Sequence, residues 1–186
     1  QTREEIRRIQ KETGITTVFV THDQEEAMSI SDMIVVMKLG VVQQIGEPQK
    51  VYDDPTNLFV AKFLGTPPIN VLQGVVKGGK LLLDGKAVMD VPGAADQEVF
   101  VGIRPEGFEP AEDGALECAV NNLEVMGRDV SVVSTHPASV NPVIRSIVNA
   151  DLKLDTSKGT IRYNIKPHKL FLFNKETENR VYFEVK

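Results

Sequence analysis

His22 is the residue of this chain whose type and position best suit chemistry on a bound ligand. It directly follows the run TTVFVT at residues 16–21, which predicts a strand buried on both faces. Asp23 comes next, and Glu26 three residues later completes a capping box, so a helix is expected to start there. In open α/β sheets, ligands bind beyond the carboxyl ends of the strands, where helices begin. His22 is therefore a candidate for contacting a phosphate or an attacking water; the alternative is a histidine that caps or packs.

Other residues with reactive side chains receive structural interpretations. Cys118 is the single cysteine, and it lies in the alternating stretch LECAV at residues 116–120, which favours a buried structural thiol. His136 and His168 have no acidic or cysteine neighbours at ligand spacing, so we interpret both as solvated or loop histidines. The sequence therefore predicts no metal site.

Composition and charge narrow the class of protein. The chain has 186 residues, of which 41% are hydrophobic and 25% charged, as is ordinary for a soluble globular protein. Its 21 Lys and Arg against 26 Asp and Glu give a net charge of -5, which argues against nucleic acid as a partner. No apolar run approaches the roughly 20 residues of a membrane span, and no leader pattern opens the chain. We expect a cytosolic protein, and the start at Gln1, without Met, is what the middle of a longer chain would give.

The elements that position His22 belong to a first region, residues 1–65, in which helices and strands alternate. The strand at 16–21 has no evident sheet neighbours in this chain, so we expect it to pair with a second chain or to adopt a non-native arrangement. The other expected elements are a helix over 3–13 that stops at Gly14, the helix from Asp23, a hairpin of 33–37 and 41–45 turning at Leu39-Gly40, and helices opening at Pro48 and Pro55, the last ending at Gly65.

The second region, residues 66–186, has a different pattern. It opens at the stiff junction Thr66-Pro67-Pro68 and continues as short strands separated by turn signals such as Asp84-Gly85. The strands are expected at 71–77, 80–83, 99–104, 115–125, 129–134, 143–150, 160–165, 169–173 and 181–185. This spacing favours a small antiparallel barrel or sandwich, so the predicted fold class is α+β overall, a partial α/β region followed by an all-β barrel.

Five stretches follow one another around and after His22. They are VTHDQEEAM at 20–28, SDMIVV at 31–36, QIGEP at 44–48, VYDDP at 51–55 and NLFVAKFLG at 57–65. This ordered series strongly resembles the switch-histidine segment of ABC transporter ATPases and the helix that leads out of their motor domain. The resemblance is nearly continuous from Arg3 to Leu72, and it implies that residues 1–65 are the C-terminal part of an ABC ATPase domain.

The resemblance also implies roles for the residues. In that family the histidine contacts the terminal phosphate of ATP and helps to position the attacking water, and this role carries over to His22. Asp23 is expected to cap its helix rather than to take part in chemistry. For the intact protein the resemblance implies ATP and Mg²⁺, a second copy of the same subunit, membrane permease subunits, and a peripheral position on the cytoplasmic face of the plasma membrane.

The sequence VGIRPE at residues 101–106 is the signature of the second region. It looks like the hallmark of the regulatory TOBE domain, an OB-fold-like barrel, that follows the motor in carbohydrate-importer ATPases, and its site residues would be Gly102, Arg104, Pro105 and Glu106. Arg104 is either an anion or ligand contact or, as we favour, a structural ion pair or hydrogen bond that closes the barrel. The resemblance implies that this domain helps to hold the dimer and receives a regulatory protein or a small ligand. Glu178 stands where the family usually has glycine, so a different final turn is expected.

Several motifs of the ATPase family are absent from the sequence. It has no G-x-x-x-x-G-K-[ST] loop, no Leu-Ser-Gly-Gly-Gln type signature and no apolar strand ending in Asp-Glu for magnesium. In the family these lie N-terminal to the first residue here, so this chain alone is expected not to hydrolyse ATP.

Two functions are therefore weighed. The first is the end of an importer ATPase, and TPPIN at 66–70 resembles carbohydrate importers more than the sulfate, iron or polyamine branches. The solute expected is therefore a sugar, with polyamine, sulfate, iron or glycerol phosphate as alternatives. The second is a non-enzymatic regulatory or ligand-binding barrel with a vestigial N-terminal appendage, whose only activity is dimerisation.

Overall fold

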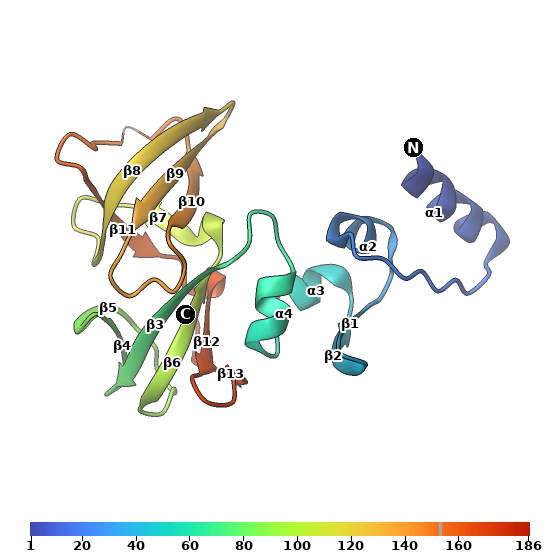
Figure 1. Ribbon diagram of the computed structural model, residues 1–186, viewed down its shortest axis with the longest axis horizontal. Coiled ribbons are helices and arrows are strands. Elements are labelled where there is room, and N and C mark those ends of the chain that lie inside the picture. The colour runs from blue at the N-terminus through green and yellow to red at the C-terminus, as the bar shows by residue number, and fades with distance from the viewer. Residues whose placement is uncertain (153) are drawn as a thin grey trace. The chain divides into compact units, whose positions relative to one another are not determined.

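The structure is a computed structural model that describes residues 1–152 and 154–186. The chain divides into two compact units, Gln1–Gly65 (unit 1) and Thr66–Lys186 (unit 2). Figure 1 labels the helices and strands of both units.

Unit 1 contains four short helices. They are α1 (Thr2–Thr13), α2 (Gln24–Ile30), α3 (Pro48–Asp53) and α4 (Leu58–Phe63). Helix α1 ends at Gly14 with a φ of 66°, the left-handed conformation that glycine adopts without strain. The helix expected from Pro55 begins three residues later, at Leu58, because the Asn57 side chain accepts a hydrogen bond from the backbone N–H of Val60 and caps it there.

A hairpin forms the small core of unit 1. Strands β1 (Ile34–Lys38) and β2 (Val41–Gly46) pair antiparallel around Leu39 and Gly40, whose φ angles are 49° and 79°. Both turn residues are left-handed, as a tight primed turn requires, so the predicted hairpin is confirmed. One face of the hairpin packs against α3 and α4, and the buried side chains of this cluster are Ile34, Val36, Val51, Val60 and Leu64.

The prediction of a strand at residues 16–21 is wrong for this chain. Residues 14–21 are neither helix nor strand, and residues 11–20 are all exposed. Val18 and Val20 are 87% and 88% exposed, whereas the pattern predicted burial on both faces. A strand needs a neighbour that accepts and donates its backbone hydrogen bonds, and unit 1 supplies none to this run. Pairing with a second chain stays a prediction.

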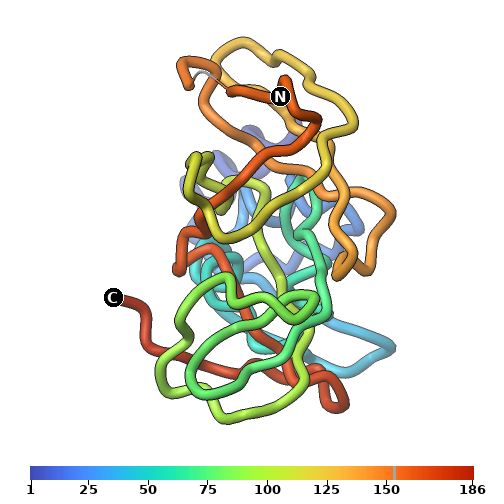
Figure 2. The backbone as a smooth tube through the Cα atoms, turned by 90° about the vertical axis from the view of Figure 1, so that its left-hand side faces the viewer, coloured from blue at the N-terminus to red at the C-terminus, as the bar shows by residue number. Residues whose placement is uncertain are grey.

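Unit 2 consists of two antiparallel sheets. The six-stranded sheet has the order β13-β12-β6-β3-β4-β5 and the five-stranded sheet the order β10-β9-β8-β11-β7. Their bounds are β3 (Asn70–Lys77), β4 (Lys80–Leu83), β5 (Lys86–Asp90), β6 (Gln97–Ile103), β7 (Phe108–Pro110), β8 (Leu116–Met126), β9 (Asp129–Thr135), β10 (Ile144–Asn149), β11 (Thr160–Ile165), β12 (Leu170–Asn174) and β13 (Arg180–Val181), with short 3₁₀ turns η1 (Pro105–Gly107) and η2 (Pro167–Lys169). Figure 2 traces these strands as a tube.

The five-stranded sheet curls toward closure. Its two edge strands, β10 and β7, contact each other, so the sheet is nearly a closed barrel and is compatible with an OB-like fold. One hydrophobic core fills the space between the sheets of unit 2, with Leu72, Val101 and Leu172 from the larger sheet and Val132 and Tyr163 from the smaller. The prediction of an α+β protein with an antiparallel β region is confirmed at this level.

Three strands differ from the expectation. The sequence analysis missed β5, because its KAVMD sequence follows the Asp84-Gly85 turn and carries charges at both ends. It also missed β7, which is only three residues long and ends in proline. The last strand was expected over 181–185, but only Arg180 and Val181 pair with β12, and the N–H of Glu184 donates instead to the carbonyl of Pro92.

Candidate functional site

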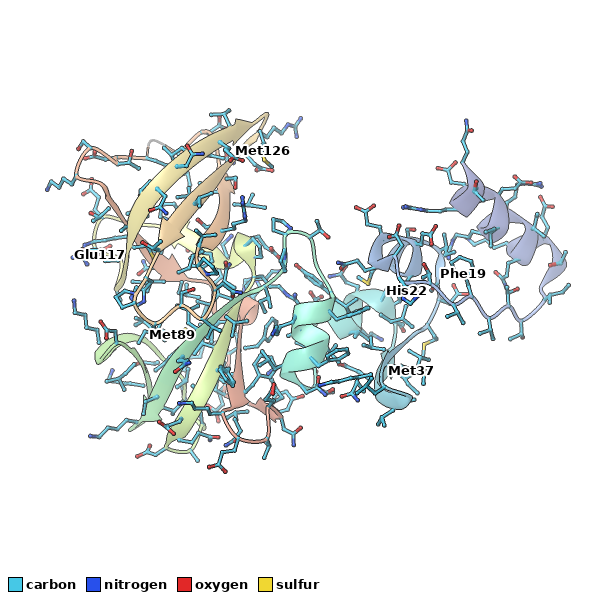
Figure 3. All side chains as sticks on the ribbon, viewed as in Figure 1. Phe19, His22, Met37, Met89, Glu117 and Met126 are labelled. Carbon is cyan, nitrogen blue, oxygen red and sulfur yellow. The ribbon has the colours of Figure 1, made fainter. Side chains whose placement is uncertain are left out.

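His22 is exposed in the turn that leads into α2 (Figure 3). The next residue, Asp23, is the N-cap of that helix, and its carboxylate accepts hydrogen bonds from the N–H groups of Glu25 and Glu26, at 2.9 and 3.2 Å. The predicted capping role of Asp23 is confirmed. Since residues 16–21 form no strand, His22 does not stand at the end of a buried strand in this chain, and only the helix half of the predicted strand–helix junction is present.

The capping box is only half formed, and Thr21 replaces its other half. The N–H of Asp23 donates to Thr21 Oγ1 at 2.9 Å, and that hydroxyl donates to Glu26 Oε2 at 2.7 Å. In a full capping box, Glu26 would accept a hydrogen bond directly from the N–H of Asp23. Here the Thr21 hydroxyl lies between them and bonds to both. Because hydrogen bonds hold the residues on both sides of His22, the backbone of its turn is fixed while the imidazole remains exposed.

Two arginines of α1 hold that helix against α2. The Arg3 guanidinium lies 3.5 Å from Asp23 Oδ2 and 3.7 Å from Glu25 Oε2. Arg7 donates to the carbonyl of Ile30 at 2.6 Å, at the other end of α2. The Arg3 pairs are exposed, and such pairs contribute about 0–1 kcal/mol each. They offset part of the negative charge that surrounds the His22 turn.

The VGIRPE motif lies where β6 passes into η1. Gly102 has no room for a side chain, because a Cβ atom there would come within 2.8 Å of Ile69 Cδ1. Arg104 is 1% exposed, and its guanidinium carbon lies 5.6 Å from the centre of the Phe171 ring. The backbone N–H of Arg104 donates to the carbonyl of Lys169 at 3.0 Å. Such burial leaves little guanidinium surface for a ligand arriving from solvent, which supports the structural interpretation of Arg104.

The remaining motif residues connect η1 with η2. Pro105 is the first residue of η1 and is buried, as its fixed φ allows at the start of a helical turn. The Glu106 carboxylate lies 3.4 Å from Lys169 Nζ in η2. The motif thus packs two short turns together at the end of β6.

Relatives of the chain carry closely related names. It is 36% identical to the sn-glycerol-3-phosphate import ATP-binding protein UgpC of Jannaschia sp., an alignment that covers 97% of this chain and 51% of the relative. The sulfoquinovosyl glycerol transport ATP-binding protein SmoE of Agrobacterium fabrum is 34% identical over 98% of this chain and 52% of the relative. The trehalose/maltose import ATP-binding protein MalK of Thermococcus litoralis is 46% identical over 65% and 35%. No protein-family model matches the chain.

The chain belongs to the family of ABC transporter ATP-binding subunits. It spans about half the length of UgpC and SmoE, or less in other relatives, down to 31%. The predicted resemblance to importer ATPases is confirmed. None of the helices in the described part of the chain is long and apolar enough to cross a membrane.

The residues present do not make a complete nucleotide site of this family. Around His22 they offer one imidazole and the acidic side chains of Asp23, Glu25 and Glu26, which repel a triphosphate. Among residues 1–152 and 154–186, no group of three His, Cys, Asp or Glu side chains could hold a metal ion.

The other candidate residues have structural environments. Cys118 is buried, as predicted, and burial raises the pKa of its thiol to about 11. His136 Nδ1 accepts a hydrogen bond from the N–H of Ala138 at 3.0 Å, and partial burial lowers the pKa of His136. His168 is exposed in η2. Both histidines lie outside the strands, as expected for loop histidines.

Sequence reasoning missed two polar contacts beside His22. The Thr21 hydroxyl bonds lie within five residues of chain, so an alternative local cap could have been considered. The other contact joins the Gln24 side chain to the backbone of Gly65, 41 residues further along, and no local pattern indicates it.

Proposed function

We propose that this chain is the C-terminal part of the ATP-hydrolysing subunit of an ABC importer, and that the intact subunit couples ATP hydrolysis to solute uptake. The observation that carries the proposal is the alignment of 97% of the chain with an import ATP-binding protein. Residues 1–65 are then the end of the ATPase domain, and residues 66–186 are its regulatory TOBE domain with an OB-like barrel.

The surface of unit 1 supports its assignment to a larger domain. One face of the β1–β2 hairpin is buried, and the opposite face carries the cross-strand pair Val35 and Ile45, which are 52% and 57% exposed. Val18 and Val20 add further exposed apolar area. Adjacent exposed apolar side chains such as Val35 and Ile45 are typical of an interaction site. In the intact subunit we assign this surface to packing against the rest of the ATPase domain.

The proposed mechanism gives His22 one task. Phosphoryl transfer depends on positioning the reacting groups and on stabilising negative charge. The task of His22 is to donate its imidazole N–H to the terminal phosphate of ATP, which serves both needs. The Thr21 and Asp23 hydrogen bonds keep the turn in place for it. Magnesium would neutralise phosphate charge when bound, held by residues outside this chain.

We propose a sugar, or a related polyol such as glycerol phosphate, as the solute. The names of the relatives include glycerol-3-phosphate, sulfoquinovosyl glycerol and trehalose/maltose, which share several hydroxyl groups. The proposed partners are a second copy of the subunit and membrane permease subunits on the inner face of the plasma membrane. In unit 2, the proposed role of Gly102, Arg104, Pro105 and Glu106 is to hold the turns at the end of β6, beside a surface for a regulatory protein or ligand.

The test replaces His22 in the longer protein that includes a phosphate-binding loop. Removing one donor to the transition state lowers kcat by about 100- to 1,000-fold, so His22→Ala should lose turnover to that extent while nucleotide affinity stays within a few fold. His168→Ala, which removes an exposed imidazole from η2, is the matched control and should leave kcat unchanged.

Two outcomes would contradict the proposal. Normal turnover of His22→Ala would remove His22 from the mechanism. Tight ATP binding by residues 1–186 alone, measured by calorimetric titration, would mean that the nucleotide-gripping residues lie within this chain after all.

A second candidate function is a non-enzymatic regulatory or ligand-binding module. It is favoured by the core of unit 2, whose buried members among the described residues lie between Leu72 and Leu172. This candidate predicts that the intact gene product has no phosphate-binding loop and that a small ligand raises the melting temperature of unit 2. The importer proposal predicts a phosphate-binding loop upstream.

A further inference from the structure

The Gln24 side chain binds one residue of the distant chain at two points. Its Oε1 accepts a hydrogen bond from the N–H of Gly65 at 2.6 Å, and its Nε2 donates to the carbonyl of the same residue at 3.5 Å. Gln24 is the first residue of α2 and lies two positions after His22. Both groups are partly buried, so the bonds are shielded from competing water.

Gly65 is the point at which unit 1 ends. It follows α4 and has a φ of 111°, which side-chain-bearing residues rarely adopt. Leu64, the residue before it, is buried in the small core with Val36 of the hairpin. After Gly65 the chain continues as Thr66-Pro67-Pro68 into unit 2. A bond to Gly65 is therefore a bond to the first peptide of the junction.

The local hydrogen bonds of Thr21 and Asp23 fix the shape of the His22 turn, and Arg3 connects it to α1, but none of these contacts connects it to the junction. The Gln24 amide provides such a connection, to the end of α4. Any displacement of Gly65 is thus transmitted to the first turn of α2, and a displacement of that turn is transmitted to the junction.

We propose that Gln24 is a positioning residue for His22. It links the His22 turn to the start of the junction between the two units. The geometry of the turn and the position of the junction therefore depend on each other. This inference rests on the proposed function of His22. It adds a route by which a partner or ligand acting on unit 2 biases ATP turnover, and by which nucleotide at His22 is sensed at the junction.

The first test uses the chain of residues 1–186 and needs no ATPase activity. Gln24→Leu removes both hydrogen bonds at similar size, and loss of one such bond should speed exchange of the Gly65 N–H about fivefold to tenfold. Gln49→Leu is the matched control, since Gln49 also lies in the first turn of a short helix but bonds only within it, to Asp53 at 3.0 Å. If the exchange rate of the Gly65 N–H is unchanged in Gln24→Leu, the proposed link between Gln24 and Gly65 is wrong.

The second test measures turnover of the longer protein. In Gln24→Leu a misplaced His22 should lower kcat about tenfold with KM unchanged, because the loss affects the transition state and not ground-state binding. Gln24→Glu keeps the Oε1 acceptor for the shorter bond and should restore most of kcat. Nucleotide should slow Gly65 exchange in the unsubstituted protein but not in Gln24→Leu.

The outcomes separate the two proposals. If the longer protein hydrolyses no ATP, the proposed function is wrong. The exchange rate of the Gly65 N–H in residues 1–186 still tests the link between Gln24 and Gly65. If His22→Ala loses turnover but Gln24→Leu keeps full kcat, His22 stands and the positioning role of Gln24 fails. Equal losses in Gln24→Leu and Gln49→Leu would indicate general destabilisation of unit 1 and would also defeat the positioning role.

Discussion

The tripeptide Val-Phe-Val occurs once in each unit, with opposite fates. In unit 1, at residues 18–20, Val18 and Val20 are 87% and 88% exposed and belong to no strand. In unit 2, at residues 99–101, both valines are fully buried in β6, which lies between β3 and β12. Identical side chains with the same β propensity therefore end up in solvent or in the core, depending on whether neighbouring strands are supplied.

The same contrast extends to the cores. Among the described residues, the buried cluster of unit 1 has five members, whereas that of unit 2 draws on both of its sheets and has twenty-two. The smaller core stabilises unit 1 less, because buried apolar area must offset the conformational entropy of every ordered residue. Unit 2 is therefore expected to be the more stable of the two, and unit 1 to open more readily.

The largest expected difference comes from an aspartate placed in each tripeptide. Val101→Asp puts an unpaired carboxylate into the core of unit 2 and should cost at least about 4 kcal/mol of unfolding free energy, enough to unfold that unit. Val20→Asp should change stability by less than about 0.5 kcal/mol, since the site is exposed. Chemical denaturation monitored by circular dichroism measures both. Equal effects would mean that the 18–20 run is buried in solution.

The pH dependence of unit 2 should carry the signature of its buried thiol. Burial raises the pKa of Cys118 from 9.0 to about 11, so between these values the unfolded chain loses a proton that the folded chain keeps. The contribution of this thiol to stability is therefore constant below pH 9 and falls as pH rises toward 11, by about 2–3 kcal/mol in total.

The control for this prediction is Cys118→Ala, which should remove the loss between pH 9 and 11. Burial also raises the pKa of Tyr163, so a further loss at still higher pH should remain in the variant. Unit 1 has no comparable buried group in its described core, so its unfolding should not follow this profile. If the loss of stability between pH 9 and 11 persists in Cys118→Ala, another group causes it.

The smallest effects concern one strained turn residue in each unit. Glu178 in unit 2 and Leu39 in unit 1 have φ angles of 60° and 49°, which cost residues with a Cβ atom about 1–2 kcal/mol relative to glycine. Glu178→Gly should raise the melting temperature of unit 2 by a few degrees, about 1 kcal/mol. Leu39→Gly should instead slow local opening of the β1–β2 hairpin, seen by amide exchange, without shifting the melting of unit 2.

Local signals gave the correct prediction at several places where a few adjacent residues decide the outcome. Gly14 ends α1, Asp23 caps α2, and the Leu39-Gly40 turn closes a hairpin, because each depends on backbone geometry within one turn of chain. The strands of unit 2 follow from alternation and turn signals in the same way, with the charged β5 and the three-residue β7 as the exceptions. The prediction of His22 as the candidate residue depends on its motif and on its place before a helix cap.

The family and the local elements of this chain follow from its sequence alone, because both depend on short runs such as VTHDQEEAM and VGIRPE. The tertiary structure alone decided which apolar runs are covered, that Arg104 is buried over Phe171, and that Gln24 reaches Gly65. The physical reason is that burial and long-range hydrogen bonds depend on which segments meet in space, and no property of residues 16–21 reveals whether a neighbouring strand is there to receive them.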